Sequence, residues 1–98
     1  MECPTVAVII PCRDEKGFIG ACLDALITQT YPASLVEIVI ADGDSTDGTL
    51  NIVEHYCASN ERIRVVQNIK QSAATGLNCA ISSTTAQVII RVDAHSVV

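Results

Sequence analysis

The sequence predicts a three-layer α/β fold in which helices cover both faces of a mostly parallel β-sheet. β-Branched apolar runs alternate along the chain with segments whose apolar residues recur at three- and four-residue spacing, the patterns of strands and amphipathic helices. The first two runs are apolar at nearly every position, which is typical of strands buried on both faces. Strands that are separated by helices do not pair through tight turns, so we expect them to run parallel.

The first half of the chain contains two expected strands and one expected helix. Residues 6–10 form a strand because five consecutive apolar residues end at Pro11. Residues 36–41 form the second strand, which ends at Asp42 and Gly43. Between them lies a helix of about three to four turns, ended by Tyr31-Pro32. Its apolar stripe consists of Phe18, Ile19, Cys22, Leu23, Leu26 and Ile27.

The second half repeats this alternation. A second helix is expected over 50–57, and the Ser45-Thr46-Asp47 stretch before it offers candidate N-caps. A third strand, a third helix and a fourth strand are expected at 63–66, 74–81 and 87–92. The chain stops a few residues later, so we expect residues 1–98 to be part of a longer domain, truncated after the fourth strand.

The composition describes one small folded domain and excludes several classes of partner. The chain has 98 residues, of which 49% are hydrophobic, and a formal net charge of −5. Nucleic acid is excluded because its binding needs a basic surface. No apolar run approaches the roughly 20 residues that span a bilayer, and the N-terminus lacks the basic region of a signal peptide. We therefore expect a cytoplasmic protein, with membrane association left open for a full-length form.

The five cysteines are expected to be reduced thiols. Their number is odd and no C-x-x-C pair occurs, which argues against both a disulfide framework and a zinc site. Most are expected to act as small core residues. They are Cys3, Cys12, Cys22, Cys57 and Cys79.

Polar residues follow each expected strand, at the edge of the sheet where ligands bind in open parallel sheets. Asp42 is the most informative of them, because it ends an otherwise apolar strand and could accept hydrogen bonds from a ribose or a base. Ser45, Thr46 and Asp47 are instead expected to serve mainly as helix caps. No Gly-rich phosphate loop is present, so a bound diphosphate would need a metal and scattered cations. The candidate cations are Arg13, Lys70 and Arg91.

Asp93 and His95 form the candidate metal site. Residues two apart in an extended segment point to the same side, so a carboxylate oxygen and an imidazole nitrogen could converge on one divalent cation. Two protein ligands suit an ion that is held largely by the phosphates of its ligand. We expect Mn²⁺ or Mg²⁺, of which Mn²⁺ tolerates histidine better.

With these loops described, the sequence resembles the family-2 glycosyltransferases with the Rossmann-like GT-A fold, similar to bacterial members that build polysaccharides. Residues 6–15 match the family's V-x-V-I-I-P-x-x-N/D-E, and residues 26–32 match its L-x-x-Q-T-Y-P. Residues 39–49 match its V-V-D-x-x-S-T-D-G-T, and 68–78 match its N-x-x-x-x-x-x-A-x-N. The family's D-x-D position holds Asp93-Ala94-His95, with histidine in the third place.

The resemblance implies which residues contact a nucleotide-diphosphate sugar. Pro11 and its neighbours would line the base pocket, Glu15 would support it, and Asp42 would bind the base or ribose. The acidic residue of the D-x-D position would hold the metal and the diphosphate. The complete nucleotide-binding set implied is Pro11, Cys12, Arg13, Glu15, Asp42, Asp44, Lys70, Asn78 and Asp93.

The resemblance implies a hexosyltransferase that moves a sugar from a nucleotide-diphosphate sugar, with a UDP-sugar favoured, to an acceptor hydroxyl on a glycan or lipid. Family domains are about twice as long as this chain, and their second half holds the acceptor site and the base that deprotonates the attacking hydroxyl. No catalytic residue is therefore assigned here, and residues 1–98 alone are expected to catalyse little.

Two alternatives remain at this point. A small receiver-like or nucleotide-binding α/β module would also gather acidic residues at strand ends, although here the third strand is followed by Asn68-Ile69-Lys70. The second alternative is that the chain has a purely structural role and self-associates, because the outer edge of the fourth strand would be open to pairing with a second copy.

Overall fold

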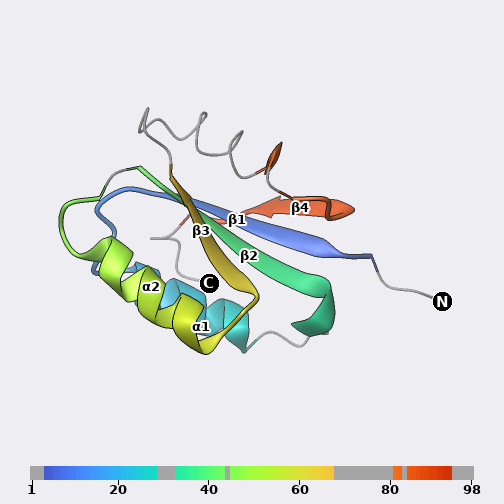
Figure 1. The fold of residues 1–98 in the computed structure, drawn as a ribbon, viewed down its shortest axis with the longest axis horizontal. Helices are drawn as coiled ribbons and strands as arrows, with labels where there is room; N and C mark the ends of the chain where they lie inside the picture. Colours follow the sequence, from blue (N-terminus) through green and yellow to red (C-terminus); the bar gives the residue numbers. More distant parts are fainter. Residues whose placement is uncertain (1–3, 29–32, 44, 68–80, 83, 94–98) are drawn as a thin grey trace.

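Four β-strands and two α-helices make up the described part of the chain, which comprises residues 4–28, 33–43, 45–67, 81–82 and 84–93 of a computed structural model (Figure 1). A short 3₁₀ helix, η1, precedes the second strand. The elements in chain order are β1 (Val6–Cys12), α1 (Ile19–Ile27), η1 (Ala33–Leu35), β2 (Val36–Asp42), α2 (Thr49–Ser59), β3 (Ile63–Gln67) and β4 (Val88–Arg91).

The four strands form one sheet in the order β3-β2-β1-β4, and all three pairings are parallel. The expected α/β fold with a parallel sheet is thus confirmed. This order is that of the classic dinucleotide-binding folds, whereas receiver-like domains have the order 2-1-3-4-5. The receiver-like alternative is therefore wrong, because its first and third strands would be neighbours.

The first strand runs further than the sequence predicted. It continues through Pro11 to Cys12, where it pairs with Asp42. Proline lacks an N–H, so it is tolerated only where no ladder bond is needed. The carbonyl of Ile9 accepts the N–H of Val92 on the β4 side, and alternation points the Pro11 nitrogen the same way, beyond the last β1–β4 pair. Pro11 therefore costs the sheet no hydrogen bond.

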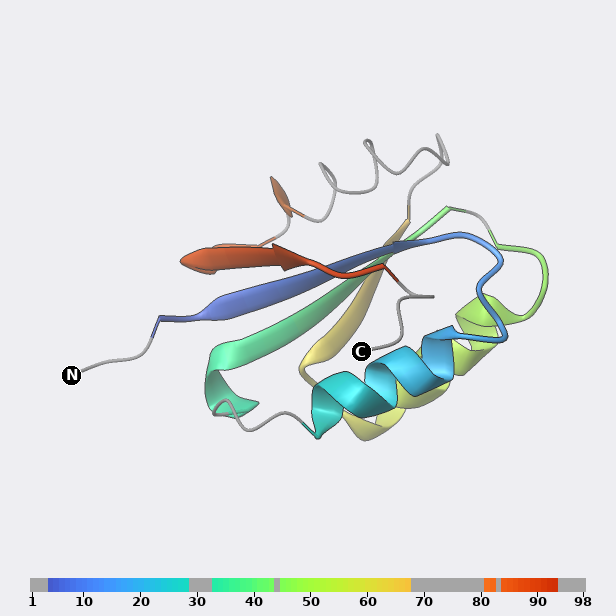
Figure 2. The same ribbon diagram turned by 180° about the vertical axis from the view of Figure 1, so that it is seen from behind.

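Both described helices cover the same face of the sheet and lie side by side (Figures 1 and 2). The even-numbered residues of β1 point into this layer, where Ile10, Leu23 and Val53 are fully buried. Tyr56 of α2 joins the helices by donating its hydroxyl proton toward the Asp24 carboxylate and the Gly20 carbonyl, at 2.6 and 3.1 Å. This layer is the main core of the domain.

Two ends of the predicted apolar stripe on α1 do not reach this core. Phe18 is 51% exposed and Ile27 is 45% exposed, because Phe18 precedes α1, which begins at Ile19, and the buried residues of α1 lie in its first half. Ile19, Cys22 and Leu23 are buried as expected. The helical period of the predicted apolar stripe is confirmed, but the stripe was predicted to extend too far at both ends.

The opposite face of the sheet is also buried at its centre, as the continuous apolar runs predicted. Ile9 and Val39 have no exposed area, and Ala41 is 1% exposed. The third predicted helix, 74–81, lies outside the described residues except for Ile81. No described helix has the length and apolar character that a bilayer crossing needs.

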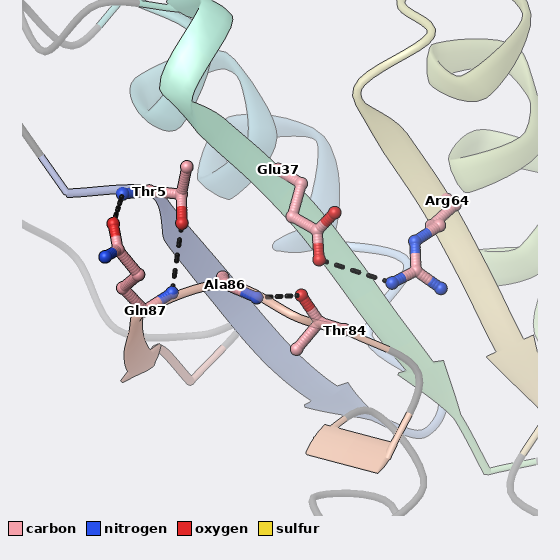
Figure 3. A network of polar contacts seen from close by, with 6 residues as sticks. All are labelled: Thr5, Glu37, Arg64, Thr84, Ala86 and Gln87. Atoms are coloured by element: carbon pink, nitrogen blue, oxygen red, sulfur yellow. Dashed lines mark hydrogen bonds and ion pairs between the residues drawn. The ribbon is translucent and has the colours of Figure 1, made fainter.

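β4 is shorter than the predicted strand over 87–92, and its apolar side chains are partly exposed. It lies at the edge of the described sheet, and reciprocal hydrogen bonds between Thr5 and Gln87 fix its start (Figure 3). The amide of Thr5 donates to the Gln87 side chain at 3.1 Å, and the amide of Gln87 donates to the Thr5 hydroxyl at 3.0 Å. Val88, Ile89 and Ile90 are each more than a third exposed, at 37%, 38% and 46%.

Candidate functional site

The carboxyl ends of β1, β2 and β3 meet at one edge of the sheet. Cys12 pairs with Asp42, and Asp42 pairs with Gln67. The loops that follow β1 and β2 therefore start side by side, as the sequence predicted for a parallel sheet. The amide of Gly43 donates to the Cys12 carbonyl at 2.8 Å, which continues the pairing beyond the last strand residues.

Asp42 lies at the base of this edge and is only 1% exposed. Its Oδ1 accepts the Ser45 hydroxyl proton at 2.6 Å, and its Oδ2 accepts the Ser45 amide at 3.2 Å. The sequence did not predict this local partner, which Asp42 reaches because the chain turns back within three residues. The carboxylate thus shapes the β2–α2 loop.

Four hydrogen bonds between described residues join the β1–α1 loop to the β2–α2 loop. Three run from backbone amides of the first loop to side chains of the second: Asp14 to the Ser45 hydroxyl at 2.9 Å, Glu15 to the Thr49 hydroxyl at 2.9 Å, and Lys16 to the Asp47 carboxylate at 3.1 Å. The fourth runs the other way, from the Thr46 amide to Asp14 Oδ1 at 2.7 Å. These four bonds join the two loops into one hydrogen-bonded unit.

The start of α2 is organised by Asp47 and Gly48. Asp47 Oδ1 accepts the amide of Thr49 at 2.9 Å and also its hydroxyl proton, so Asp47 satisfies the first helical amide as predicted. The N-cap position itself is occupied by Gly48, whose φ of 100° is readily adopted only by glycine. Ser45 and Thr46, the other cap candidates, instead contact the first loop.

Hydrogen bonding also affects the charge of this unit. The Thr49 hydroxyl bond, followed by amide bonds, holds the pKa of the Asp47 carboxyl below its ordinary value. Asp47 therefore carries its negative charge over a wide pH range at the start of α2, where a carboxylate is favoured.

Cys12 lies beneath the loops with its side chain in the helix-facing core, 7% exposed. Burial, and then the negative charges of Asp42, Glu15 and Asp47, raise the pKa of its thiol to about 12. The thiol stays protonated at neutral pH and is a poor nucleophile. Among the described cysteines, Cys12, Cys22 and Cys57 are all free, in agreement with the expectation of reduced thiols.

The other predicted residues of the first loop are Pro11, Arg13 and Glu15, which lie next to Cys12 along the chain. Pro11 and Glu15 are half-buried, and Arg13 is exposed between two anchored neighbours. The Glu15 carbonyl accepts the amides of Phe18 and Ile19, both at 2.9 Å, and so leads the chain into α1. The first loop therefore presents a guanidinium at the carboxyl edge of the sheet.

Asp93 follows β4 at the same edge. The Val92 amide donates to the Ile9 carbonyl at 2.9 Å, so the chain continues alongside β1 toward its carboxyl end. Asp93 Oδ1 lies 3.4 Å from Arg91 Nη2, and both side chains are about half exposed. Such an exposed ion pair is weak, so the carboxylate remains accessible to a ligand.

Four residues of the predicted site lie outside the described residues: Asp44, Lys70, Asn78 and His95. Within the described ranges, no group of three or more His, Cys, Asp or Glu side chains could hold a metal ion. The expected metal pair is therefore represented by Asp93 alone. The structure does not test the predicted contacts with a nucleotide.

An open groove of about 250 Å³ lies at the other end of the sheet. Glu37 and Arg64, the second residues of β2 and β3, belong to its lining and form an ion pair with Oε1 and Nη2 3.3 Å apart (Figure 3). Glu61 and Arg62 complete its lining. Because these residues precede or begin the strands, the groove is separate from the edge that carries Asp42.

Sequence reasoning missed the roles of Asp14 and Thr49 in joining the loops. Asp14 was noted only as part of the loop, and its φ of 53° makes it the one non-glycine residue with positive φ in the described chain. Aspartate adopts this conformation more readily than most residues. The aspartate directly before Glu15 was therefore the available signal of a left-handed backbone conformation. Its hydrogen-bond partners could not be identified from local sequence, because they are 31 and 32 residues away.

Comparison with known proteins shows which family the chain resembles. The profile described as "Glycosyl transferase family 2" matches residues 7–98. The succinoglycan biosynthesis protein ExoA of Rhizobium meliloti is 33% identical over 90 residues, which is 90% of this chain and 27% of ExoA. The chain spans less than a third of the length of such curated relatives, at 30%, 14% and 27% of three of them.

Solved structures show the same fold. The mannosyltransferase PcManGT from Pyrobaculum calidifontis, solved in complex with GDP-Man and Mn²⁺, has a TM-score of 0.87 and 30% identity; the alignment covers 94% of this chain and 28% of that one. S. aureus TarS 1-349 in complex with UDP-GlcNAc has a TM-score of 0.81 and 29% identity, covering 93% and 26%. The expected GT-A fold is thereby confirmed, and the chain belongs to glycosyl transferase family 2.

Proposed function

We propose that residues 1–98 are the nucleotide-sugar-binding part of a longer glycosyltransferase, which moves a sugar from a nucleotide diphosphate to an acceptor hydroxyl. The observation that carries this proposal is the pair of joined loops at the carboxyl ends of β1 and β2, in a fold with a TM-score of 0.87 to a transferase that binds GDP-Man. Ligands of open parallel sheets bind at this edge.

Asp42 and the first loop are proposed to bind the base and ribose. The oxygens of Asp42 accept bonds from Ser45, and each carboxylate oxygen has a second lone pair that can accept another donor. Pro11 and Glu15 would border the base, and Arg13 would approach the diphosphate. Cys12 would act from beneath, since its side chain is in the core. Asp44, Lys70 and Asn78 complete the proposed set.

A divalent cation fits the donor chemistry at Asp93. Its carboxylate is exposed and lies at the same edge as Asp42, and oxygen ligands suit Mn²⁺ and Mg²⁺. His95 is proposed as the second protein ligand. When bound, such an ion neutralises charge that develops on a leaving diphosphate. Arg91, which pairs with Asp93, would contribute a positive charge beside it.

The donor is proposed to be a UDP-sugar and the product a glycan. TarS binds UDP-GlcNAc, whereas PcManGT binds GDP-Man, so both bases occur among related folds. ExoA is named for succinoglycan biosynthesis, which supports a polysaccharide or glycolipid acceptor. We further propose that isolated copies of the chain pair along the exposed edge of β4.

The test is calorimetric titration of the chain with UDP, GDP and TDP, each with and without Mn²⁺. We expect one nucleotide to bind more tightly than the others, and to bind more tightly with Mn²⁺. ATP serves as the control nucleotide and should bind weakest. Absence of binding by every nucleotide, both in the 98-residue chain and in a longer protein that contains it, would refute the proposal.

A further inference from the structure

Asp14 holds a backbone conformation that its surroundings must maintain. Its φ of 53° lies in the left-handed region, which is unfavourable for residues with a side chain, although aspartate tolerates it better than most. Such conformations persist where the surrounding structure fixes them, and they cluster at functional sites. Asp14 lies in the loop that follows β1, at the carboxyl edge of the sheet.

Two hydrogen bonds from the opposite loop fix Asp14. Its amide donates to the Ser45 hydroxyl at 2.9 Å, and its Oδ1 accepts the Thr46 amide at 2.7 Å. The Ser45 hydroxyl in turn donates to Asp42 Oδ1 at 2.6 Å. A continuous chain of hydrogen bonds therefore connects Asp14 to the buried carboxylate of Asp42.

This connection determines where Arg13 lies. On one side, Cys12 is held in the core and its carbonyl accepts the Gly43 amide at 2.8 Å. On the other side, Asp14 is bound to Ser45 and Thr46. The exposed Arg13 lies between Cys12 and Asp14, both of which are hydrogen-bonded to the loop that follows Asp42. Its backbone is consequently fixed relative to Asp42.

We propose that Asp14 is a positioning residue for a nucleoside diphosphate, an inference that rests on the proposed function above. Its two bonds hold the backbone of Arg13 at a set separation from Asp42, so that one ligand can meet the Arg13 cation at its diphosphate and the Asp42 carboxylate at its base or ribose. Fixing both groups before binding removes the entropy that ordering the loop would otherwise cost. Asp14 itself does not contact the ligand.

Two substitutions separate this role from simple stability. Asp14→Gly adopts φ of 53° without strain but loses the acceptor for the Thr46 amide. Asp14→Asn keeps an oxygen acceptor and also tolerates the left-handed region. Glu61→Gly is the matched control, because it removes an exposed carboxylate from the turn before β3, at the other end of the sheet.

The measurement is the Kd for UDP with Mn²⁺, together with the melting temperature and hydrogen exchange of the Thr46 amide. We expect Asp14→Gly to raise the Kd by about tenfold, the effect of losing one hydrogen bond to a charged group, and to speed Thr46 exchange. Glu61→Gly should keep the wild-type Kd, and Asp14→Asn, which replaces a charged acceptor with a neutral one, should raise the Kd less than Asp14→Gly does. If Asp14→Gly melts too early to be measured, Asp14→Glu, which displaces the carboxylate by one methylene, should raise the Kd instead.

The outcomes distinguish this inference from the proposed function. If neither the 98-residue chain nor a longer protein that contains it binds a nucleotide, the proposed function fails and the inference fails with it. If the wild type binds and Asp14→Gly, or Asp14→Glu in its place, binds equally well, only the inference is overturned. An Asp14→Asn variant as weak as Asp14→Gly would also overturn it, because the acceptor oxygen would then be irrelevant.

Discussion

Replacing Ser45 with alanine should destabilise the domain, although Ser45 is not fully buried. Its hydroxyl is the link between Asp42 and Asp14: it donates to Asp42 Oδ1 at 2.6 Å and accepts the Asp14 amide at 2.9 Å. Ser45→Ala removes both bonds and leaves Asp42, which is 1% exposed, with the Ser45 amide as its remaining described partner. The substitution therefore acts on a buried carboxylate from a distance of three residues.

The size of the effect follows from the two bonds. A hydrogen bond to a charged group contributes about 1.5–3 kcal/mol, and a neutral one about 1 kcal/mol. The Asp14 amide is in an exposed setting, so water can replace Ser45 there and most of the loss comes from Asp42. We expect the free energy of unfolding to fall by about 2 kcal/mol, and the melting temperature of a domain of this size to fall by about 8–16 °C.

Urea denaturation followed by circular dichroism measures this change, and Ser59→Ala is the matched control. The Ser59 hydroxyl is exposed and donates only to helix carbonyls, at 3.2 and 3.4 Å, so its loss should change stability by less than about 0.5 kcal/mol. Ser45→Thr, which keeps the hydroxyl, should recover most of the loss. A Ser45→Ala variant as stable as Ser59→Ala would refute the role given to the Asp42–Ser45 bond.

Four further predictions concern binding, titration and association. Asp42→Asn should weaken nucleotide binding equally with and without Mn²⁺, because its proposed partner is the base or ribose; an unchanged Kd in calorimetry would reduce Asp42 to a loop-forming residue. The double substitution Asp93→Ala with His95→Ala should abolish the Mn²⁺-dependent part of that binding, and persistence of the Mn²⁺ effect would remove both residues from the site. The raised pKa of Cys12 means that the unfolded thiol loses its proton from about pH 9.0 while the folded thiol keeps it to about pH 12, so stability should fall across this window; a Cys12→Ser variant with the same pH profile in urea titrations would contradict this. Ile90→Lys should suppress pairing along the β4 edge, and a wild-type chain that elutes as a monomer at every concentration in size-exclusion chromatography would show that no such pairing occurs.

The sequence by itself determined the fold class and the edge of the sheet at which Asp42 lies. The apolar runs of β1 and β2 and the helical period between them were enough to predict a parallel sheet, because burial on both faces leaves a pattern in the residues themselves. Asp42 could be assigned to the carboxyl edge for the same reason. The strand ends were less certain: Pro11 was expected to end β1, but its nitrogen faces a position where β4 no longer pairs.

The tertiary structure decided how the loops at that edge are held. Asp14, Ser45 and Thr49 are ordinary loop residues in the sequence, and capping was the simplest interpretation of Ser45. Their hydrogen bonds connect positions 31 to 34 residues apart, and such pairings follow from strand register rather than from local pattern. The strand order β3-β2-β1-β4, which excludes the receiver-like alternative, was likewise decided by which strands pack together, because several orders share one alternation of helices and strands.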